Sequence, residues 1–191
     1  MDYTMNCTSP IAPEMQRITL ELPENLLHIF FPILQKGIRV PAMVGCSLKS
    51  LLCEQFAIPA DYVTGRITTI FFNNSPVDDL DQTIVQDDSR ITLSAAMPGL
   101  VGATMRRGGY YAALRGGISH IVDHGGAEAE YGTVRLKLFN LLLAELGPLV
   151  LARGLILEHD ELIDLLKNLP GHSGDLSASS GKVFLAVRFS Y

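Results

Sequence analysis

An α+β fold is predicted because two kinds of apolar pattern alternate along the 191 residues of this chain. In some segments apolar residues recur at every second position, which is typical of half-buried strands. In others they recur every three or four positions, which is typical of helices with one buried face. A segment with seven glycines in 29 positions, residues 104–132, separates a strand-rich part from a mainly helical part.

The N-terminal part opens with three predicted strands. Apolar and polar side chains alternate over residues 16–22, which predicts a half-buried strand that Pro23 ends. Residues 26–34 are apolar and rich in Ile and Phe, which predicts a second strand interrupted at Pro32. Residues 38–44 alternate again, and we expect them to be the partner strand of residues 26–34.

A helix and the remaining strands of this part follow. Residues 46–56 have apolar side chains at helical spacing, with a small polar residue at the start to cap the first turn. Residues 66–72 are β-branched and aromatic and predict a strand. After a turn, a short strand and an acidic stretch, residues 90–95 predict the last strand of the unit. Pro98-Gly99 then breaks the pattern.

The C-terminal part is predicted to be two helices and a strand. Residues 133–152 are strongly apolar at helical spacing, with a kink or an end expected at Pro148. Residues 159–169 predict a second helix. Residues 182–191 alternate, and we expect this last strand to pair with residues 16–22. The first helix would pack on the sheet or on a second copy of the chain, so we predict a homodimer.

One apolar stretch has the length of a membrane span, residues 138–157. A glutamate, an arginine, a glycine and a proline interrupt it. We therefore expect a buried or interface helix and no membrane partner.

Four segments carry a family resemblance: a strand and helix over residues 38–52, a strand and Asn turn over 70–77, an acidic turn and strand over 84–93, and the closing turn over 98–102. In this order they resemble the MoaD/ThiS sulfur-carrier proteins, which have the ubiquitin-like β-grasp fold. The resemblance spans about residues 26–103. It implies an α+β fold made of a β-grasp unit and a C-terminal, mainly helical extension that ends in a strand.

The resemblance also implies a chemistry that this chain departs from. Carriers of the family end in a free Gly-Gly, which an E1-like enzyme adenylates before a sulfurtransferase makes the thiocarboxylate. Here Gly102-Ala103 stands at that place and the chain continues, so its carboxyl group is held in a peptide bond. We therefore expect a non-enzymatic binding or interaction protein on this fold, with an E1-like enzyme or a sulfurtransferase as the partner classes that the resemblance implies.

A processed carrier is the alternative that the sequence leaves open. Cleavage after Gly109 or Gly117 would expose a Gly-Gly end. The second of these ends, with Leu114, Arg115 and Gly116 before Gly117, resembles the tail of ubiquitin.

The predicted organisation has four parts. They are an irregular lead-in (1–14), a β-grasp domain (15–103), a Gly-rich connector with a short helix near 110–114 (104–132), and a helical extension with a C-terminal strand (133–191).

The connector holds the best candidate for a ligand site. Arginines and glycines occur together there: Arg106, Arg107, Gly108, Gly109 and Arg115. Glycine lets backbone N–H groups turn toward an anion, and arginine binds phosphate or carboxylate through two hydrogen bonds. The alternative is a linker whose arginines pair with surface carboxylates.

A metal site is the second candidate in the connector. His120, Asp123 and His124 have a spacing that would place both imidazoles one turn apart on a helix. A metal ion is thus the one cofactor that the sequence suggests, and a small-anion or metal-binding enzyme is a further alternative. No third ligand is evident nearby, and solvated histidines are the other interpretation.

Composition limits the classes of function. The net charge of −5 argues against a general nucleic-acid binder, so we expect no DNA partner. Three cysteines, Cys7, Cys46 and Cys53, form no paired framework, and the N-terminus has no secretory signal pattern. These features are typical of a reduced cytoplasmic protein. No P-loop, dinucleotide or hydrolase motif is present, which favours a non-enzymatic function.

Overall fold

The computed structural model describes residues 15–115, 117–118, 129–170 and 181–190. The strands are β1 Gln16–Pro23, β2 Ile38–Val44, β3 Thr69–Phe72, β4 Ser75–Pro76, β5 Ser89–Ser94, β6 Glu130–Phe139, β7 Leu155–Glu158 and β8 Lys182–Ser190. The helices are η1 Glu24–Phe30, α1 Phe31–Lys36, α2 Leu48–Ser50, η2 Leu51–Gln55, α3 Ala60–Gly65, α4 Gly99–Met105, η3 Tyr110–Arg115, α5 Leu142–Arg153 and α6 His159–Lys167. η1 and η3 are 3-10 helices, and η2 is a π-helical turn.

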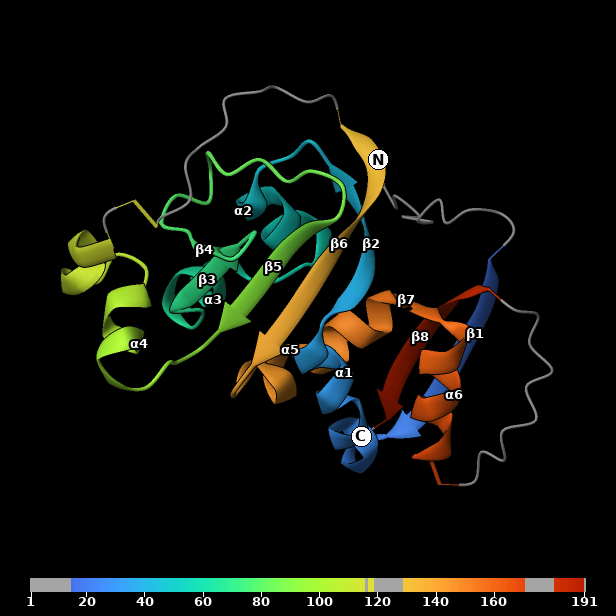
Figure 1. Ribbon diagram of the computed structural model, residues 1–191. Helices are drawn as coiled ribbons and strands as arrows, with labels where there is room; N and C mark the ends of the chain where they lie inside the picture. Colours follow the sequence, from blue (N-terminus) through green and yellow to red (C-terminus); the bar gives the residue numbers. More distant parts are fainter. Residues whose placement is uncertain (1–14, 116, 119–128, 171–180, 191) are drawn as a thin grey trace, which may run out of the picture.

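The fold is α+β, as predicted, and its strands form one mixed sheet. The eight strands of the described residues lie in the order β1-β8-β7-β2-β6-β5-β3-β4. The pairs β1–β8 and β5–β6 are parallel, and the other pairs are antiparallel. Figure 1 shows β1, β8 and α6 at one end of this twisted sheet, and β3, β4 and α4 at the other.

The predicted pairing of the two ends of the chain is confirmed. β1 and β8 run side by side from the Gln16–Val183 pair to the Pro23–Ser190 pair. Both strands turn their apolar positions to the same face, because Ile18 lies opposite Leu185 and Leu20 opposite Val187. Each alternating segment therefore supplies the partner that the other needs.

The prediction of one helix over residues 133–152 is wrong in its first third. Residues 130–139 form β6, and the helix α5 begins only at Leu142. Val134, Leu136 and Leu138 are each fully buried, which is the alternation of a strand. Asn140, with φ +57°, turns the chain between the strand and the helix. Among its described residues the C-terminal extension therefore has three strands and is less helical than predicted.

The prediction of a strand over residues 26–34 is also wrong. This segment forms η1 and then α1. Pro32 stands in the first turn of α1, where its missing N–H costs no hydrogen bond. Phe30 and Leu34 lie one helical turn apart and are both fully buried. The expected hairpin is absent, and β2 pairs instead with β6 and β7.

The helix boundaries follow from local caps. At the start of α2 the Ser47 hydroxyl accepts a hydrogen bond of 3.1 Å from the Ser50 N–H. The predicted helix over 159–169 is confirmed as α6, where Glu158 and Glu161 form a capping box. The predicted short helix near 110–114 is confirmed as η3.

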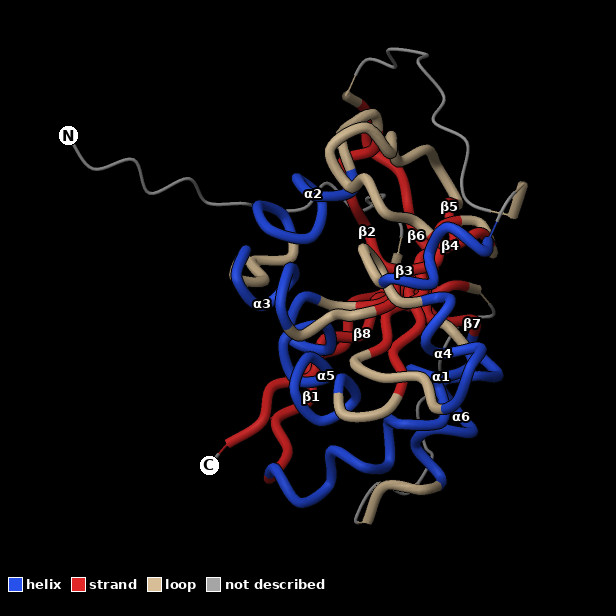
Figure 2. The backbone as a smooth tube through the Cα atoms, turned by 90° about the vertical axis from the view of Figure 1, so that its left-hand side faces the viewer, coloured by secondary structure: helices blue, strands red, loops and turns tan. Residues whose placement is uncertain are grey.

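The two faces of the sheet differ. On β2 the side chains of Ile38 and Val40 are buried, whereas those of Arg39 and Pro41 on the other face stay partly exposed. Buried leucines of α1, α2, α5 and α6 join the same hydrophobic cluster as the inward residues of the strands. Figure 2 shows α2 and α3 together on one side of β2 and β6. The opposite face of β2 and β6, which we call the open face, carries side chains that stay at least partly exposed in the described residues.

The sheet crosses the predicted domain boundaries. β6 begins at the end of the predicted connector and continues into the predicted extension, yet it lies between β2 and β5 and pairs with both. α5 packs with α1, β6 and β8 of its own chain. Among the described residues no helix combines the length and the hydropathy that a membrane crossing needs.

Candidate functional site

After the last strand of the N-terminal part the chain forms two short helices, α4 and η3, which pack on each other beyond the β4 edge (Figure 1). Gly99, with φ +73°, begins α4 directly after Pro98. Gly102 is buried in this helix, and a Cβ added to it would lie 1.8 Å from the Met97 carbonyl oxygen. The glycine that the resemblance aligns with the carrier tail therefore lies in a packed helix and not in an extended end.

Arg107 fastens this segment to α3. Its backbone N–H donates to the Thr68 carbonyl at 2.8 Å, and its Nη2 donates to the Val63 carbonyl at 2.6 Å and to the Thr64 carbonyl at 3.2 Å. The guanidinium thus binds the free carbonyls at the C-terminal end of a helix, where a cation is favourable. Burial lowers the pKa of Arg107.

Arg115 and Gly108 meet at one carboxylate, that of Asp78. The Arg115 Nη2 lies 2.7 Å from Asp78 Oδ1, and the Gly108 N–H donates to the same oxygen at 3.1 Å. The Arg115 side chain is 1% exposed and that of Asp78 is 46% exposed, so the ion pair joins a buried guanidinium to a carboxylate at the surface. Asp78 was not predicted as a partner of these residues, because it stands in an acidic stretch far from the connector in the sequence.

The five residues of the predicted anion site are thus only partly brought together. Arg107, Gly108 and Arg115 converge, but on a carboxylate and on carbonyl oxygens of their own chain. Arg106 is exposed, and Gly109 closes a turn onto the Arg106 carbonyl at 3.2 Å. Within the described residues, these hydrogen bonds fix the loop and η3 to α3 and to Asp78.

The other predicted sites of the connector lie mostly outside the described residues. His120, Asp123, His124 and Gly116 all fall there, while Gly117 follows η3. In the part of the chain that is described, no group of three His, Cys, Asp or Glu side chains is placed to hold a metal ion.

The two helices carry large apolar side chains on their outer surface. We call this the α4–η3 surface, and it consists of Leu100, Val101, Tyr110, Tyr111, Leu114 and Ile118. Tyr110 is 91% exposed, and Leu100 and Leu114 are each 70% exposed. Six of the nine large exposed hydrophobic residues in the described chain lie here, although the segment is short. The sequence held a signal for this surface, because Tyr110, Tyr111, Leu114 and Ile118 stand inside the Gly-rich segment 104–132 and Leu100 and Val101 come shortly before it.

A groove of about 680 Å³ runs beside this surface. Val63, Leu80 and Ala112 give it apolar walls. Asp79, Asp81 and Lys49 also line it, and the Lys49 Nζ lies 3.0 Å from Asp81 Oδ1. The acidic stretch that sequence analysis noted therefore borders a hollow next to the α4–η3 surface.

The two cysteines of the described residues show no sign of activation. Cys46 donates to the Met43 carbonyl at 3.3 Å, and Cys53 lines the groove. Burial raises the pKa of both thiols. Both therefore remain protonated at neutral pH, which does not suit a nucleophile.

Comparisons of the chain with protein-family models, with curated proteins and with solved structures find no match.

Proposed function

We propose that this chain is a non-enzymatic protein-interaction module built on a β-grasp sheet, and that the α4–η3 surface is its contact surface. One observation carries the proposal: the polarity of the segment that contains α4 and η3 is inverted. Arg107, between the helices, and Arg115 of η3 bind the body of the molecule, while the large leucines and tyrosines of the two helices are exposed.

This inversion is unfavourable for the isolated chain. A surface helix ordinarily buries its apolar stripe and exposes its charges. Burial of one large apolar side chain is worth about 1.5–3 kcal/mol, so several exposed ones forgo a large stabilisation. Contiguous exposed apolar residues beside polar ones are typical of protein–protein contact sites, and tyrosines are enriched in them.

The order of the strands supports the β-grasp part of the proposal. Five neighbouring strands, β2-β6-β5-β3-β4, contain a parallel central pair with antiparallel strands on both sides. A helical segment connects β2 to β3. A β-grasp sheet has the same order and directions, but its first strand precedes the others in the sequence. Here β6 takes that place although it follows the last strand, so we infer a circular permutation of the β-grasp.

The family resemblance suggests the kind of partner. In the carriers it is the segment after the last strand that enters the E1-like enzyme. In this chain α4 follows β5, which takes the place of that last strand, and it presents Leu100 and Val101 to solvent. We therefore infer that a separate protein of this class, an E1-like enzyme or a sulfurtransferase, receives the α4–η3 surface by apolar contact.

The carrier alternative is less compatible with the sheet. Cleavage after Gly109 or Gly117 would separate β6 from the chain that carries β2 and β5. β6 pairs with seven residues of β2 and with six of β5, so the shortened chain would lose the centre of its sheet. No contact of the described residues favours the enzyme alternative over the interaction module.

The proposal is tested by the size of the native complex. We expect the full chain in a gently prepared extract of its host to elute as a complex larger than its 20.8 kDa monomer. The double variant Leu100→Ser, Leu114→Ser should elute at the size that this chain has without the partner protein, because it loses apolar contacts at the centre of the interface. Size-exclusion chromatography with detection of the chain measures this.

The matched control is Leu141→Ser, which changes a leucine that is 56% exposed elsewhere on the molecule. Substitutions at such exposed sites change stability little, so all three chains should have similar melting temperatures. Equal elution of the three chains would contradict the proposal, as would a complex that contains this chain alone.

A further inference from the structure

Three arginines stand side by side across the open face of the sheet. Arg39 of β2 lies directly opposite Arg135 of β6, and Arg135 lies beside Arg90 of β5. Neighbouring strands are about 4.8 Å apart, so the three side chains leave the sheet as one row. Like charges directly opposite each other destabilise a sheet, and this row therefore calls for a compensating anion.

The chain itself supplies one carboxylate to the row. The Arg135 Nε lies 2.7 Å from Asp88 Oδ1, and the Arg39 Nε lies 3.9 Å from the same oxygen. The hydrogen bond from Arg135, with smaller contributions from Arg39 and Arg90, lowers the pKa of Asp88. Three guanidiniums and one carboxylate leave two positive charges. Lys137, two residues beyond Arg135 on the same face of β6, adds a third.

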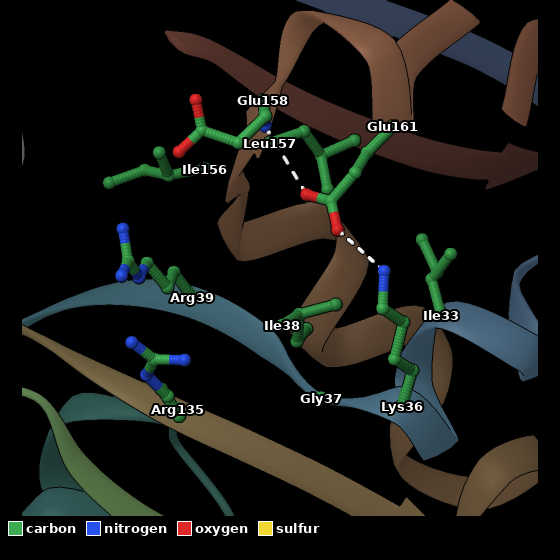
Figure 3. Close-up of a pocket in the computed structure, with 10 residues that line it drawn as sticks. All are labelled: Ile33, Lys36, Gly37, Ile38, Arg39, Arg135, Ile156, Leu157, Glu158 and Glu161. Atoms are coloured by element: carbon green, nitrogen blue, oxygen red, sulfur yellow. Dashed lines mark hydrogen bonds and ion pairs between the residues drawn. The ribbon is translucent and has the colours of Figure 1, made fainter. Parts of the chain in front are cut away.

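A cavity opens beside this row, where β2 and β7 separate after their single pair at Arg39 and Ile156. Its volume is about 270 Å³. Figure 3 shows Arg39 and Arg135 on neighbouring strands at one side of the cavity, with Ile156 and Ile33 among its walls. The cavity thus joins a cationic end to an apolar wall.

The opposite wall is acidic, but its charges are engaged. The Lys36 Nζ lies 2.9 Å from Glu161 Oε1, and the second oxygen of Glu161 accepts from the Glu158 N–H at 3.3 Å. The Glu158 carboxylate caps α6 in turn. These carboxylate oxygens can still accept hydrogen bonds from hydroxyl groups of a ligand.

We propose that the row of Arg39, Arg90 and Arg135 binds the phosphate group of a small phosphate monoester, whose organic part lies in the adjoining cavity. A phosphate monoester carries about −1.5 to −2 charges at pH 7, which matches the two positive charges that the row leaves uncompensated. The planar guanidinium binds phosphate oxygens through two parallel hydrogen bonds. The cavity is at the small end of ligand sites, which excludes a dinucleotide.

Calorimetric titration of the full chain with glycerol 3-phosphate tests this proposal. The wild type should bind it saturably, while glycerol, which lacks the phosphate, should not bind. Arg39→Gln and Arg90→Gln should each weaken binding by about tenfold or more, because each removes charge-assisted hydrogen bonds to the phosphate. The matched control is Arg188→Gln on β8, an exposed arginine outside the row, which should bind like the wild type.

A second readout separates binding from stability. Without ligand, Arg90→Gln should melt at the temperature of the wild type or above it, since the variant relieves repulsion within the row. With saturating glycerol 3-phosphate, the melting temperature of the wild type should rise more than that of the variant. Absence of saturable binding by the wild type would overturn the proposal. Equal affinities of Arg90→Gln and Arg188→Gln would do the same.

This site is independent of the α4–η3 surface. The Leu100→Ser, Leu114→Ser variant should bind glycerol 3-phosphate like the wild type, so failure of one proposal leaves the other standing.

Discussion

At the scale of single residues, one ion pair ties the two halves of the chain together on the helical side. Glu145 of α5 accepts from Arg66, which follows α3, with 2.9 Å from Nε to Oε2, and also from the Tyr62 hydroxyl of α3. The hydrogen bonds from Arg66 and Tyr62 lower the pKa of Glu145 to about 2. Both side chains of the ion pair are partly exposed, so salt will screen part of the effect.

This pair predicts a pH-dependent stability difference between the wild type and Glu145→Gln. A carboxylate whose pKa falls from 4.5 to about 2 on folding stabilises the native state above pH 4.5. The contribution is lost as the pH falls from 4.5 toward 2. Urea unfolding at several pH values should show the wild type more stable than the variant near pH 7, with the difference vanishing near pH 2.

The matched control for this measurement is Glu130→Gln, which changes an exposed glutamate on β6. Its difference from the wild type should stay close to zero throughout. A difference for Glu145→Gln that does not change with pH would show that Glu145 acts through packing and not through its charge.

The residues of both candidate sites illustrate what the sequence could not show. Arg115 and Asp78 are 37 positions apart, and Arg39 and Arg135 are 96 apart, so neither contact leaves a local pattern. The arginine row becomes visible only when the pairing of β2, β5 and β6 is known. The apolar residues of the α4–η3 surface can be seen in the sequence, but their exposure depends on the hydrogen bonds by which Arg107 and Arg115 orient the two helices.

At the scale of elements, β6 shows why periodicity misled. Val134 and Leu138 are four positions apart, as on a helix face, but Leu136 between them belongs to the same buried set. Buried apolar residues on every second position indicate a strand. Only a short turn separates the apolar residues of β6 from those of the helix α5. Over residues 133–152 as a whole, helical spacing was therefore the stronger pattern.

The alternation along β6 predicts a large loss of stability at one residue and almost none at its neighbour. Leu136→Ala should lower the free energy of unfolding by about 2–5 kcal/mol, because the side chain is fully buried at the centre of the sheet. Lys137→Ala, on the open face, should change it by less than about 0.5 kcal/mol. Denaturant unfolding measures both values. Equal losses from the two substitutions would contradict the strand assignment.

At the scale of the whole molecule, the two ends of the chain were easier to predict than its centre. An alternating segment at each end lacks a local partner, so the pairing of β1 with β8 follows from the need to bond both strands. The centre could not be predicted in this way. β6 lies between β2 and β5 although it follows the connector in the sequence. The sequence patterns of segments 38–44 and 90–95 give no sign that a third strand separates them.

The proposed contact between the α4–η3 surface and another protein can be detected by site-specific photo-crosslinking. A photoreactive phenylalanine analogue would replace Tyr110, which is 91% exposed, in the full chain within its own host. The control carries the same analogue at Tyr131 on β6, which is 66% exposed. We predict that illumination joins the chain at position 110, and not at position 131, to one separate protein. Equal and diffuse crosslinking at both positions would contradict a protein contact at the α4–η3 surface.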